Sequence, residues 1–214
     1  MTRRIAWDIS HQEFTIEDHY YFSILKRELV NSGADVVELR DLRGLAKFDV
    51  LVINYPEKKF GKDEAKQIIR FVEQGGRVLV LGYYKNEDNI AETVNSISQY
   101  FGLELLHDEI YDERNNLDDD KYLIVTSKVL RFNKGVSKIL MPCTAPIRTL
   151  DENIEIVAKA EETAKTKLGN KPIIAAMKQF GKGQYILIGS CVFWDNFSIE
   201  KYDNLKFALN LLLE

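Results

Sequence analysis

Short apolar runs and helical repeats alternate along the first half of the chain. Residues 49–53 (DVLVI) and 78–81 (VLVL) are rich in β-branched and leucine residues and too short for helices, which is typical of strands buried on both faces. The stretch between them ends at Gly75-Gly76, a pair that favours a left-handed helix exit. Two strands joined by a helix pair in parallel through a right-handed crossover, so this stretch predicts a βαβ unit. The apolar residues at helical spacing are Ala65, Ile68, Ile69 and Val72.

A second unit of the same kind precedes the first. Residues 4–8 (RIAWD) and 36–39 (VVEL) predict strands. Thr15, followed three residues later by Asp18, matches the capping-box pattern, so we expect a helix to begin there and to end at Gly33. The order strand, helix, strand, strand, helix, strand predicts an α/β fold with a doubly wound, mainly parallel, flavodoxin-like sheet and helices on both faces.

The second half of the chain has a weaker pattern. Asn86 is expected to cap a helix whose inward stripe ends at Phe101. Short apolar runs separated by turns then predict a β-rich insertion at about 107–171. A hairpin within residues 173–188 and a last leucine-rich helix complete a single domain that spans residues 1–214. The short runs lie at 103–106, 122–125, 138–150 and 154–160.

Composition narrows the possible partners and compartments. The chain carries a formal net charge of -4 with basic and acidic residues mixed throughout, so we expect no nucleic acid partner. No apolar run approaches the roughly 20 residues that span a bilayer, so direct membrane insertion is not expected. Cys143 and Cys191 have no CxxC spacing and are interpreted as inert thiols. Together with the absence of a signal-peptide pattern, this predicts a cytoplasmic protein.

Polar and aromatic side chains follow at least four of the predicted strands. In an open α/β sheet the carboxyl ends of parallel strands converge on one crevice, where ligands usually bind. Polar loops are also common without any binding role, because loops are exposed to solvent. We nevertheless predict ligand-binding residues there, namely Ser10, His11, Glu13, Asn54, Tyr55, Tyr83, Tyr84, Ser190, Asp195 and Asn196.

Two other interpretations of this sheet edge, catalysis and metal binding, depend on His11. Asp8 or Glu13 can orient its ring for acid/base chemistry near neutral pH, which would indicate a hydrolase or isomerase. Zinc and iron accept imidazole and carboxylate ligands, but the spacing of these three residues is not a recognised metal motif, so no metal is predicted. The acidic stretch 108–120 lacks the glycine and closing glutamate of an EF-hand. Glycine-rich phosphate loops are missing as well, and we expect no cofactor.

The ordered elements resemble the class I glutamine amidotransferase-like superfamily. The resemblance is strongest to its non-catalytic branch, found in intraflagellar-transport-type and in gliding-motility and ABC-transporter-associated proteins, with trehalose-utilisation-type proteins as more distant relatives. Nearly the whole chain is covered. The segments that carry the resemblance are AWDISHQEF with VNSGADVVEL, FDVLVINYPEKKFGKDEAKQIIRFVEQGGRVLVLGYY, FNKGVSKILMPCTAPI, and FGKGQYILIGSCVFWDN with YDNLKFALNLLL.

The catalytic triad of that superfamily is missing at the matching positions. Its amidotransferases place a nucleophilic cysteine on the turn after a central strand and a histidine and glutamate after a later one. Here the first turn holds Gly82-Tyr83-Tyr84 and the second segment, residues 189–195, has no histidine. The resemblance therefore implies the fold and argues against glutamine hydrolysis.

These observations predict a non-catalytic domain that binds a small molecule, such as a carbohydrate, or a protein. The expected pocket is lined by His11, Tyr83 and Tyr84, since tyrosine suits stacking on a sugar or another protein. A third possibility is an assembly protein that uses the aromatic residues of CVFWDNF as an interface. In that case Trp194 should be exposed in the monomer, and the partner could be a second copy of the chain, giving a homo-oligomer.

Overall fold

The parallel half of the central sheet is built from the apolar runs of the sequence. The structure, a computed structural model, describes residues 2–169 and 172–214. Parallel neighbours follow the order β2-β1-β3-β4-β12, which confirms the α/β fold with a mainly parallel core. The strands are β1 (Arg4–Asp8), β2 (Asp35–Leu39), β3 (Val50–Asn54), β4 (Arg77–Leu81) and β12 (Gly183–Ile188).

An antiparallel half extends this sheet beyond β12. The strand β11 (Ile173–Phe180) forms a hairpin with β12, and its other edge pairs with β9 (Ile147–Thr149) and β10 (Ile154–Lys159). The strand β5 (Leu103–Leu105) then pairs with β9. Within the described residues the sheet thus has nine strands, five of them in the parallel half.

A second, smaller sheet lies beside the first. It consists of β6 (Asn116–Leu117), β7 (Asp120–Thr126) and β8 (Ile139–Pro142), all antiparallel. The β-rich stretch expected at 107–171 therefore divides its strands between the two sheets, and residues 170–171 of it lie outside the described residues.

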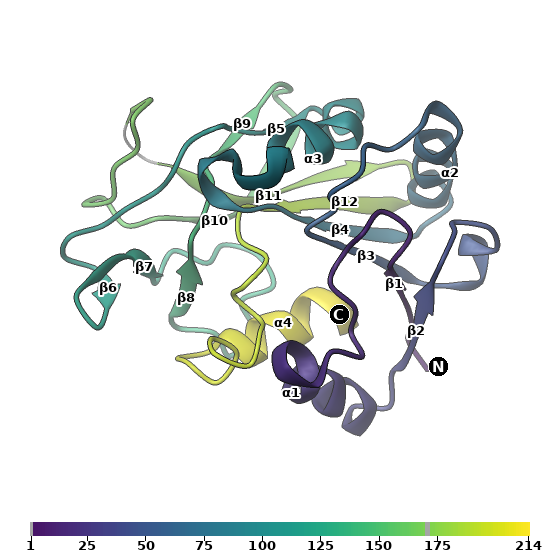
Figure 1. The fold of residues 1–214 in the computed structure, drawn as a ribbon, viewed down its shortest axis with the longest axis horizontal. Coiled ribbons are helices and arrows are strands. Elements are labelled where there is room, and N and C mark those ends of the chain that lie inside the picture. Colours follow the sequence, from purple (N-terminus) through teal and green to yellow (C-terminus); the bar gives the residue numbers. More distant parts are fainter. Residues whose placement is uncertain (1, 170–171) are drawn as a thin grey trace.

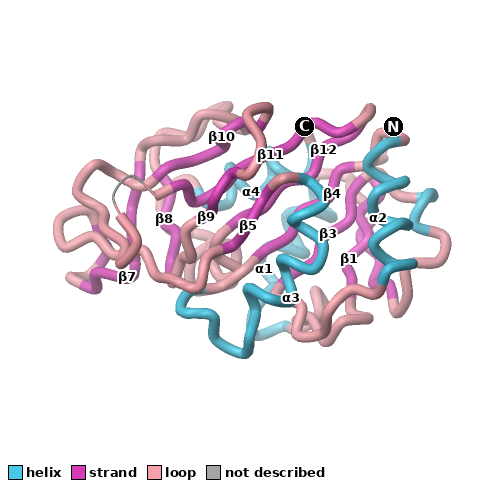
Figure 2. Tube along the Cα trace, turned by 90° about the horizontal axis from the view of Figure 1, so that it is seen from above, coloured by secondary structure: helices cyan, strands magenta, loops and turns pink. Residues whose placement is uncertain are grey.

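Helices cover both faces of the central sheet. The helices α1 (His19–Asn31) and α4 (Asn204–Leu213) lie below it in Figure 1, and α2 (Lys62–Glu73) and α3 (Ile90–Ser98) lie above it. Figure 2, turned to look from above, shows α2 and α3 passing over the strands. No helix within residues 2–169 and 172–214 has both the length and the apolar character needed to cross a bilayer. Short 3-10 turns occur at Leu45–Lys47, Tyr84–Asn89 and Gln99–Phe101.

Two helix starts differ from the sequence expectation. Asp18, not Thr15, is the N-cap of α1, because its carboxylate accepts from the backbone N–H groups of Tyr20 and Tyr21. Asn86 lies within an irregular turn rather than at the N-cap of α3, although its Oδ1 atom still accepts from the N–H of Ala91 at 2.9 Å.

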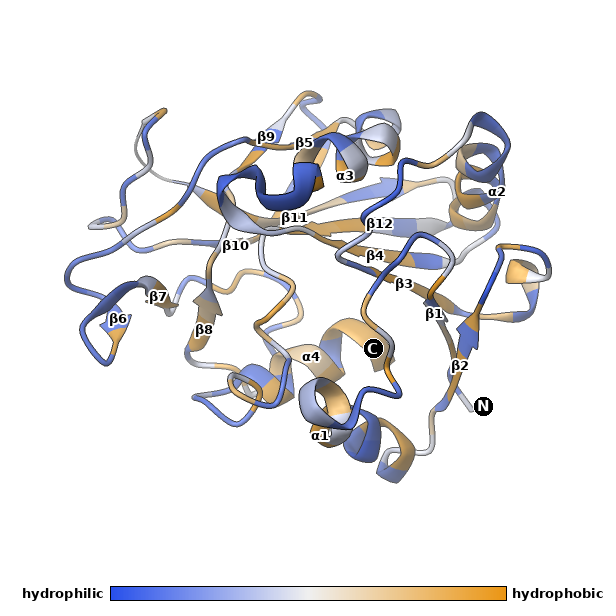
Figure 3. Ribbon diagram, viewed as in Figure 1, coloured by the Kyte–Doolittle hydropathy of each residue, from blue (hydrophilic) through white to orange (hydrophobic). Residues whose placement is uncertain are grey.

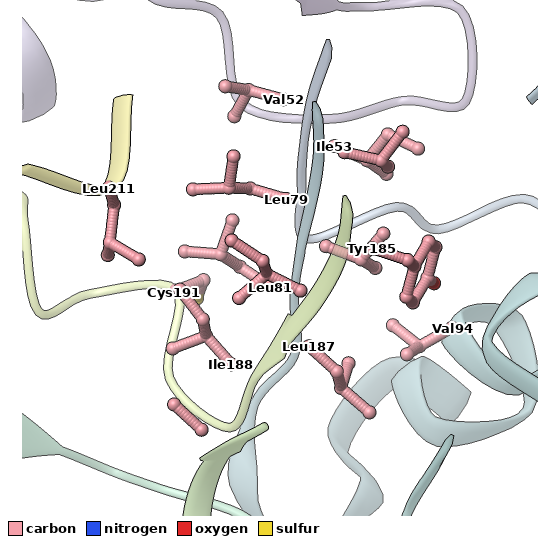
Figure 4. Packing of buried hydrophobic residues seen from close by; sticks show 14 of the residues in the cluster. Val52, Ile53, Leu79, Leu81, Val94, Tyr185, Leu187, Ile188, Cys191 and Leu211 are labelled. Atoms are coloured by element: carbon pink, nitrogen blue, oxygen red, sulfur yellow. The ribbon is translucent and has the colours of Figure 1, made fainter. Parts of the chain in front are cut away.

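The core follows from the alternation of side chains along β3, β4 and β12. Figure 4 shows Ile53, Tyr185 and Leu187 on the side of α3, and Leu79 and Leu211 on the opposite side. Figure 3 shows that the central strands are hydrophobic, as strands buried on both faces must be.

Trp194 belongs to this core, which corrects the expectation of an exposed interface residue. Its side chain is 0% exposed. Its ring packs on Trp7 with centroids 5.5 Å apart and stacks on Phe193 with centroids 5.0 Å apart. Because so large an aromatic surface is removed from water within one chain, this residue cannot form an intermolecular interface without unfolding its surroundings.

Candidate functional site

A cavity opens at the carboxyl ends of β3, β4 and β12. Its volume is about 350 Å³, a size that suits a small ligand. We call it the strand-end cavity. Its lining consists of Phe14, Tyr21, Phe22, Asn54, Tyr55, Glu57, Tyr83, Asp88, Cys191, Val192 and Asp195.

Asn54, the last residue of β3, contributes an amide to the lining of this cavity. The residue is fully buried, and its Oδ1 atom accepts from the indole N–H of Trp194 at 3.1 Å. Its Nδ2 atom is buried and has no hydrogen-bond partner among the described residues. A buried donor without a partner costs about 1–3 kcal/mol. The amide is therefore a group that a bound ligand or water would satisfy.

Tyr55 is held in an unusual backbone conformation immediately after β3. Its φ is +62°, in the left-handed region that non-glycine residues rarely adopt. Its ring contacts Phe14 and Tyr83 with centroid distances of 5.5 and 5.7 Å. Its hydroxyl donates to Asp88 Oδ2 at 2.7 Å, and burial raises the pKa of the phenol. Strain of this kind persists where surrounding contacts fix the residue, and it is frequent at binding sites.

The two tyrosines after β4 have different environments. Tyr83 lines the strand-end cavity, and burial followed by its contact with the Cys143 thiol raises the pKa of its hydroxyl. Tyr84 packs instead on Tyr122, at a centroid distance of 5.6 Å, and under the Lys85 ammonium at 4.3 Å. One of the pair thus faces the cavity, and the other belongs to an aromatic and cationic cluster beside the small sheet.

The segment after β12 contributes one side chain with altered acidity. Burial raises the pKa of Asp195 to about 6, although the N–H groups of Phe197 and Ser198 donate to its Oδ1 atom. Ser190 is turned away, since its hydroxyl donates to the carbonyl of Pro142 at 2.6 Å. Asn196 is occupied by α1, where its amide donates to backbone carbonyls and to a serine hydroxyl.

A second polar group lies at the carboxyl end of β1. His11 Nδ1 is 3.0 Å from Asp8 Oδ2 and 3.7 Å from Glu13 Oε1, and we call Asp8, His11 and Glu13 the β1 cluster. Burial, together with the charge of Asp8, raises the pKa of Glu13 to about 8. Burial disfavours a charged His11, but the hydrogen bond and charge of Asp8 outweigh it and raise the pKa of the ring. The imidazole packs on Phe60 with ring centroids 4.0 Å apart.

The expected pocket lined by His11, Tyr83 and Tyr84 does not form. Tyr83 lines the strand-end cavity, whereas His11 is 3% exposed beneath Phe60 and Tyr84 faces Lys85. Of the ten residues predicted to bind a ligand, the cavity brings together Asn54, Tyr55, Tyr83 and Asp195. The residues outside its lining are Ser10, His11, Glu13, Tyr84, Ser190 and Asn196.

Sequence reasoning missed part of the lining. Phe14 and Tyr21 come from the loop after β1 and from the first turn of α1, and Asp88 comes from the irregular turn before α3. Of these three, Phe14 carried a signal of proximity to a strand end, because it directly follows the polar residues after β1.

The lining combines aromatic faces with negative charge. Glu57, Asp88 and Asp195 contribute carboxyl groups, and no lysine, arginine or histidine is among the lining residues. Such a surface repels phosphates and carboxylates, since an anion would lie beside like charges in a partly buried site. Neutral hydroxyl or amide groups can instead donate to these carboxylates.

The fold and the cavity together define a class of protein. A mainly parallel core with helices on both faces, and a cavity at the carboxyl ends of its strands, defines an α/β domain with a cavity of ligand size. The chain belongs to the family described as Domain of unknown function (DUF4350), whose sequence profile matches residues 22–212.

Comparison with known proteins finds a relative along nearly the whole chain and solved structures of the same fold. The chain is 48% identical over 221 residues to an "Uncharacterized protein" of Aquifex aeolicus (strain VF5), with 99% of this chain and 94% of that protein covered. The solved mmIFT52 N-terminal domain is 18% identical with a TM-score of 0.83, over 99% of this chain and 98% of that one. A thua-like protein from Parabacteroides merdae ATCC 43184 is 14% identical with a TM-score of 0.57, over 99% and 88% of the two chains. At such low identity the solved structures show the fold alone.

Proposed function

We propose that this domain binds a small, uncharged, hydroxyl-bearing molecule of the carbohydrate class in the strand-end cavity. The observation that carries the proposal is the buried Nδ2 atom of Asn54, which lacks a partner among the described residues and belongs to the cavity lining. An amide donor among the lining residues of an aromatic cavity is the kind of group that fixes the orientation of a polar ligand.

The chemistry of the lining favours a sugar over other small molecules. The faces of Phe14, Tyr55 and Tyr83 can contact the apolar C–H face of a sugar ring. The carboxyl groups of Asp88 and Asp195 can accept hydrogen bonds from its hydroxyl groups. The absence of cationic lining residues disfavours sugar phosphates, nucleotides and organic acids.

Binding without catalysis fits the side chains present. Cys191, the thiol in the lining, is fully buried, and burial raises its pKa well above the usual range. A protonated thiol is a poor nucleophile. The hydrolase or isomerase alternative requires His11 at an open pocket, and its ring nitrogens instead face Asp8 and Glu64 beneath Phe60.

A panel of ligands tests the proposal. The full chain is titrated by isothermal calorimetry with glucose, galactose, mannose and N-acetylglucosamine, and at least one sugar should bind saturably. The expected Kd is about 1 mM or tighter, which corresponds to a binding free energy of about −4 kcal/mol or more favourable. The corresponding sugar phosphates should bind much more weakly. Saturable binding of the phosphates with none of the neutral sugars, or no binding by either group, would overturn the proposal.

Paired asparagine variants assign the binding to the cavity. Asn54→Asp keeps an acceptor for Trp194 but removes the Nδ2 donor, and it should weaken sugar binding about tenfold or more. Asn210→Asp is the matched control, because Asn210 is also buried but its amide donates to the carbonyls of Phe132 and Lys134, outside the cavity lining. Equal losses in the two variants would contradict the assignment.

A protein partner is the second candidate, and one surface favours it. Tyr20 and Phe197 are 64% and 55% exposed and lie edge to face, with ring centroids 5.4 Å apart. Exposed aromatic pairs of this kind are typical of the centre of protein interfaces. If the partner is a second copy of this chain, sedimentation velocity should detect a dimer that the double variant Tyr20→Ser/Phe197→Ser abolishes; a wild-type monomer at all concentrations would exclude self-association.

A further inference from the structure

The β1 cluster brings ligand-type atoms together around one point. One oxygen of Asp8, the Nδ1 atom of His11 and one oxygen of Glu13 all lie within 4.8 Å of one another. The side chains of Asp8 and Glu13 are 0% exposed and that of His11 is 4% exposed. The spacing of these three residues matches no known metal motif, but the loop after β1 brings their side chains together.

The cluster contains a carboxyl oxygen that has no hydrogen-bond partner within the described residues. Glu13 Oε2 accepts from the backbone N–H of His11 at 2.7 Å. Its other oxygen, Oε1, is buried, has no hydrogen-bond partner among the described residues and is directed at His11 Nδ1 from 3.7 Å. Buried carboxylate oxygens are normally paired with a cation or a donor.

The far side of the imidazole is arranged as it is in metal sites. His11 Nε2 lies 3.3 Å from Glu64 Oε1. A proton on Nε2 would be held by this carboxylate and would leave the Nδ1 lone pair among the oxygens of Asp8 and Glu13. A histidine that ligates a metal almost always donates its other N–H to such an acceptor, which fixes the tautomer and the ring orientation.

The remaining neighbour, Ser10, supports the same arrangement. Its backbone N–H and hydroxyl both point to Asp8 Oδ1, at 3.0 and 2.7 Å, and the hydroxyl is 2.9 Å from His11 Nδ1. These contacts orient the Asp8 carboxylate and leave Oδ2 as the atom nearest the ring, 3.0 Å from Nδ1.

We propose that Asp8, His11 and Glu13 bind one divalent transition-metal ion of the zinc type, at a site separate from the strand-end cavity. Zinc bonds of about 2.0–2.1 Å in a tetrahedral site put ligand atoms about 3.4 Å apart. The two measured separations, 3.0 and 3.7 Å, bracket that value. Imidazole with carboxylates favours zinc over calcium or magnesium, which take oxygen ligands.

The site would order the loop after β1, which hydrogen bonds join to the loop that precedes α2. The carbonyl of His11 accepts from the N–H groups of Glu57 and Lys58 at 2.9 and 3.1 Å. Glu57 belongs to the cavity lining, and so does Phe14, which follows Glu13 directly. A metal at the β1 cluster would therefore order one wall of the cavity without contacting the ligand.

Cobalt and zinc binding to the full chain tests the proposal. The protein is stripped with a chelator, and CoCl₂ or ZnCl₂ is added both to the folded protein and during refolding from urea, because the cluster is sealed. The wild type should take up one Co²⁺ per chain, with the visible absorption of imidazole and carboxylate coordination, and ZnCl₂ should displace it with a Kd on the order of 1 μM or below.

Variants assign the metal to these residues. Glu13→Gln should lower Zn²⁺ affinity by at least about a hundredfold, and Glu64→Ala, which removes the acceptor for Nε2, by about tenfold. His107→Ala is the matched control, since His107 also lies beside a carboxylate, 3.6 Å from Glu92, but on the surface. Wild-type protein that binds neither ion stoichiometrically would overturn the proposal and would leave a proton as the group that neutralises Glu13. Unchanged affinity in Glu13→Gln would overturn it as well.

Discussion

The indole N–H of Trp194 donates to the Oδ1 atom of Asn54 over 3.1 Å. This hydrogen bond joins the segment after β12 to the end of β3, deep in the molecule. It also fixes the orientation of the amide, because a flipped amide would turn its own Nδ2 donor toward the indole N–H donor. The donor left over, Asn54 Nδ2, is the one that belongs to the cavity lining.

Removal of this indole donor should therefore affect both stability and binding. Trp194→Phe keeps an aromatic ring but leaves Asn54 Oδ1 without its partner, so the free energy of unfolding should fall by about 1–3 kcal/mol from the lost hydrogen bond, with a further loss from the smaller ring. Sugar binding should weaken as well. Urea denaturation and titration calorimetry measure the two effects, and a variant as stable as the wild type would show that the hydrogen bond contributes little.

Alanine at each of the two tyrosines after β4 should separate packing from binding. Tyr83 is partly buried against the core and lines the cavity, so Tyr83→Ala should lower the melting temperature and abolish sugar binding. Tyr84→Ala should leave sugar binding unchanged, because its ring faces Lys85 and Tyr122. Thermal melts with and without the sugar identified by calorimetry give the answer. A binding loss in Tyr84→Ala equal to that in Tyr83→Ala would refute this distinction.

Restoring a cysteine after β4 should not create a glutaminase. Tyr83→Cys would place a thiol in the cavity, but none of the three histidines of the chain belongs to the lining, and both ring nitrogens of His11 face carboxylates. Without a base, the thiol stays largely protonated near pH 7. Ammonia release from glutamine should therefore equal that of the wild type; a measurable gain would contradict the reasoning.

Asp195 should make stability depend on pH in the weakly acidic range. Its pKa is raised to about 6 in the folded chain, against about 3.9 for an unfolded aspartate. Between these values the folded state holds more protons, so stability falls as the pH rises, by at most about 1.4 kcal/mol per pH unit. The contribution is complete below about pH 4 and lost above about pH 6.

The variant Asp195→Asn removes this proton and keeps the shape of the side chain. Urea denaturation of both proteins should show that the wild type loses stability relative to the variant as the pH rises from about 4 to 6. A difference between the two proteins that is constant over this interval would contradict the raised pKa.

The sequence indicates the parallel core well because a strand that is buried on both faces must be apolar at nearly every position. β3 and β4 are apolar at nearly every position and buried throughout. The irregular turn before α3 had no such signal. Lys85 and Asn86 adopt left-handed backbone conformations there. Lys85 is held by contacts distant in sequence, such as its N–H donating to the carbonyl of Asp108 at 3.0 Å.

The location of the candidate site could be predicted from the sequence, but the residues that line it could be predicted only in part. Strand ends placed Asn54 and Tyr55 correctly at one edge of the sheet. The direction of each side chain depends on loop geometry, which is why Tyr83 faces the cavity and its neighbour Tyr84 does not. The β1 cluster was visible as a polar stretch, but its burial under Phe60 follows from tertiary packing alone.

The position of β12 beside β4 affects how the chain can fold during synthesis. β4 ends at Leu81, whereas its second neighbour in the sheet begins only at Gly183. A ribosome must therefore make most of the chain before β4 is paired on both edges. Until then the nascent N-terminal units expose an unpaired backbone edge of β4, which is a template for pairing with other chains. These units therefore remain open to such pairing until residues 183–188 have been made.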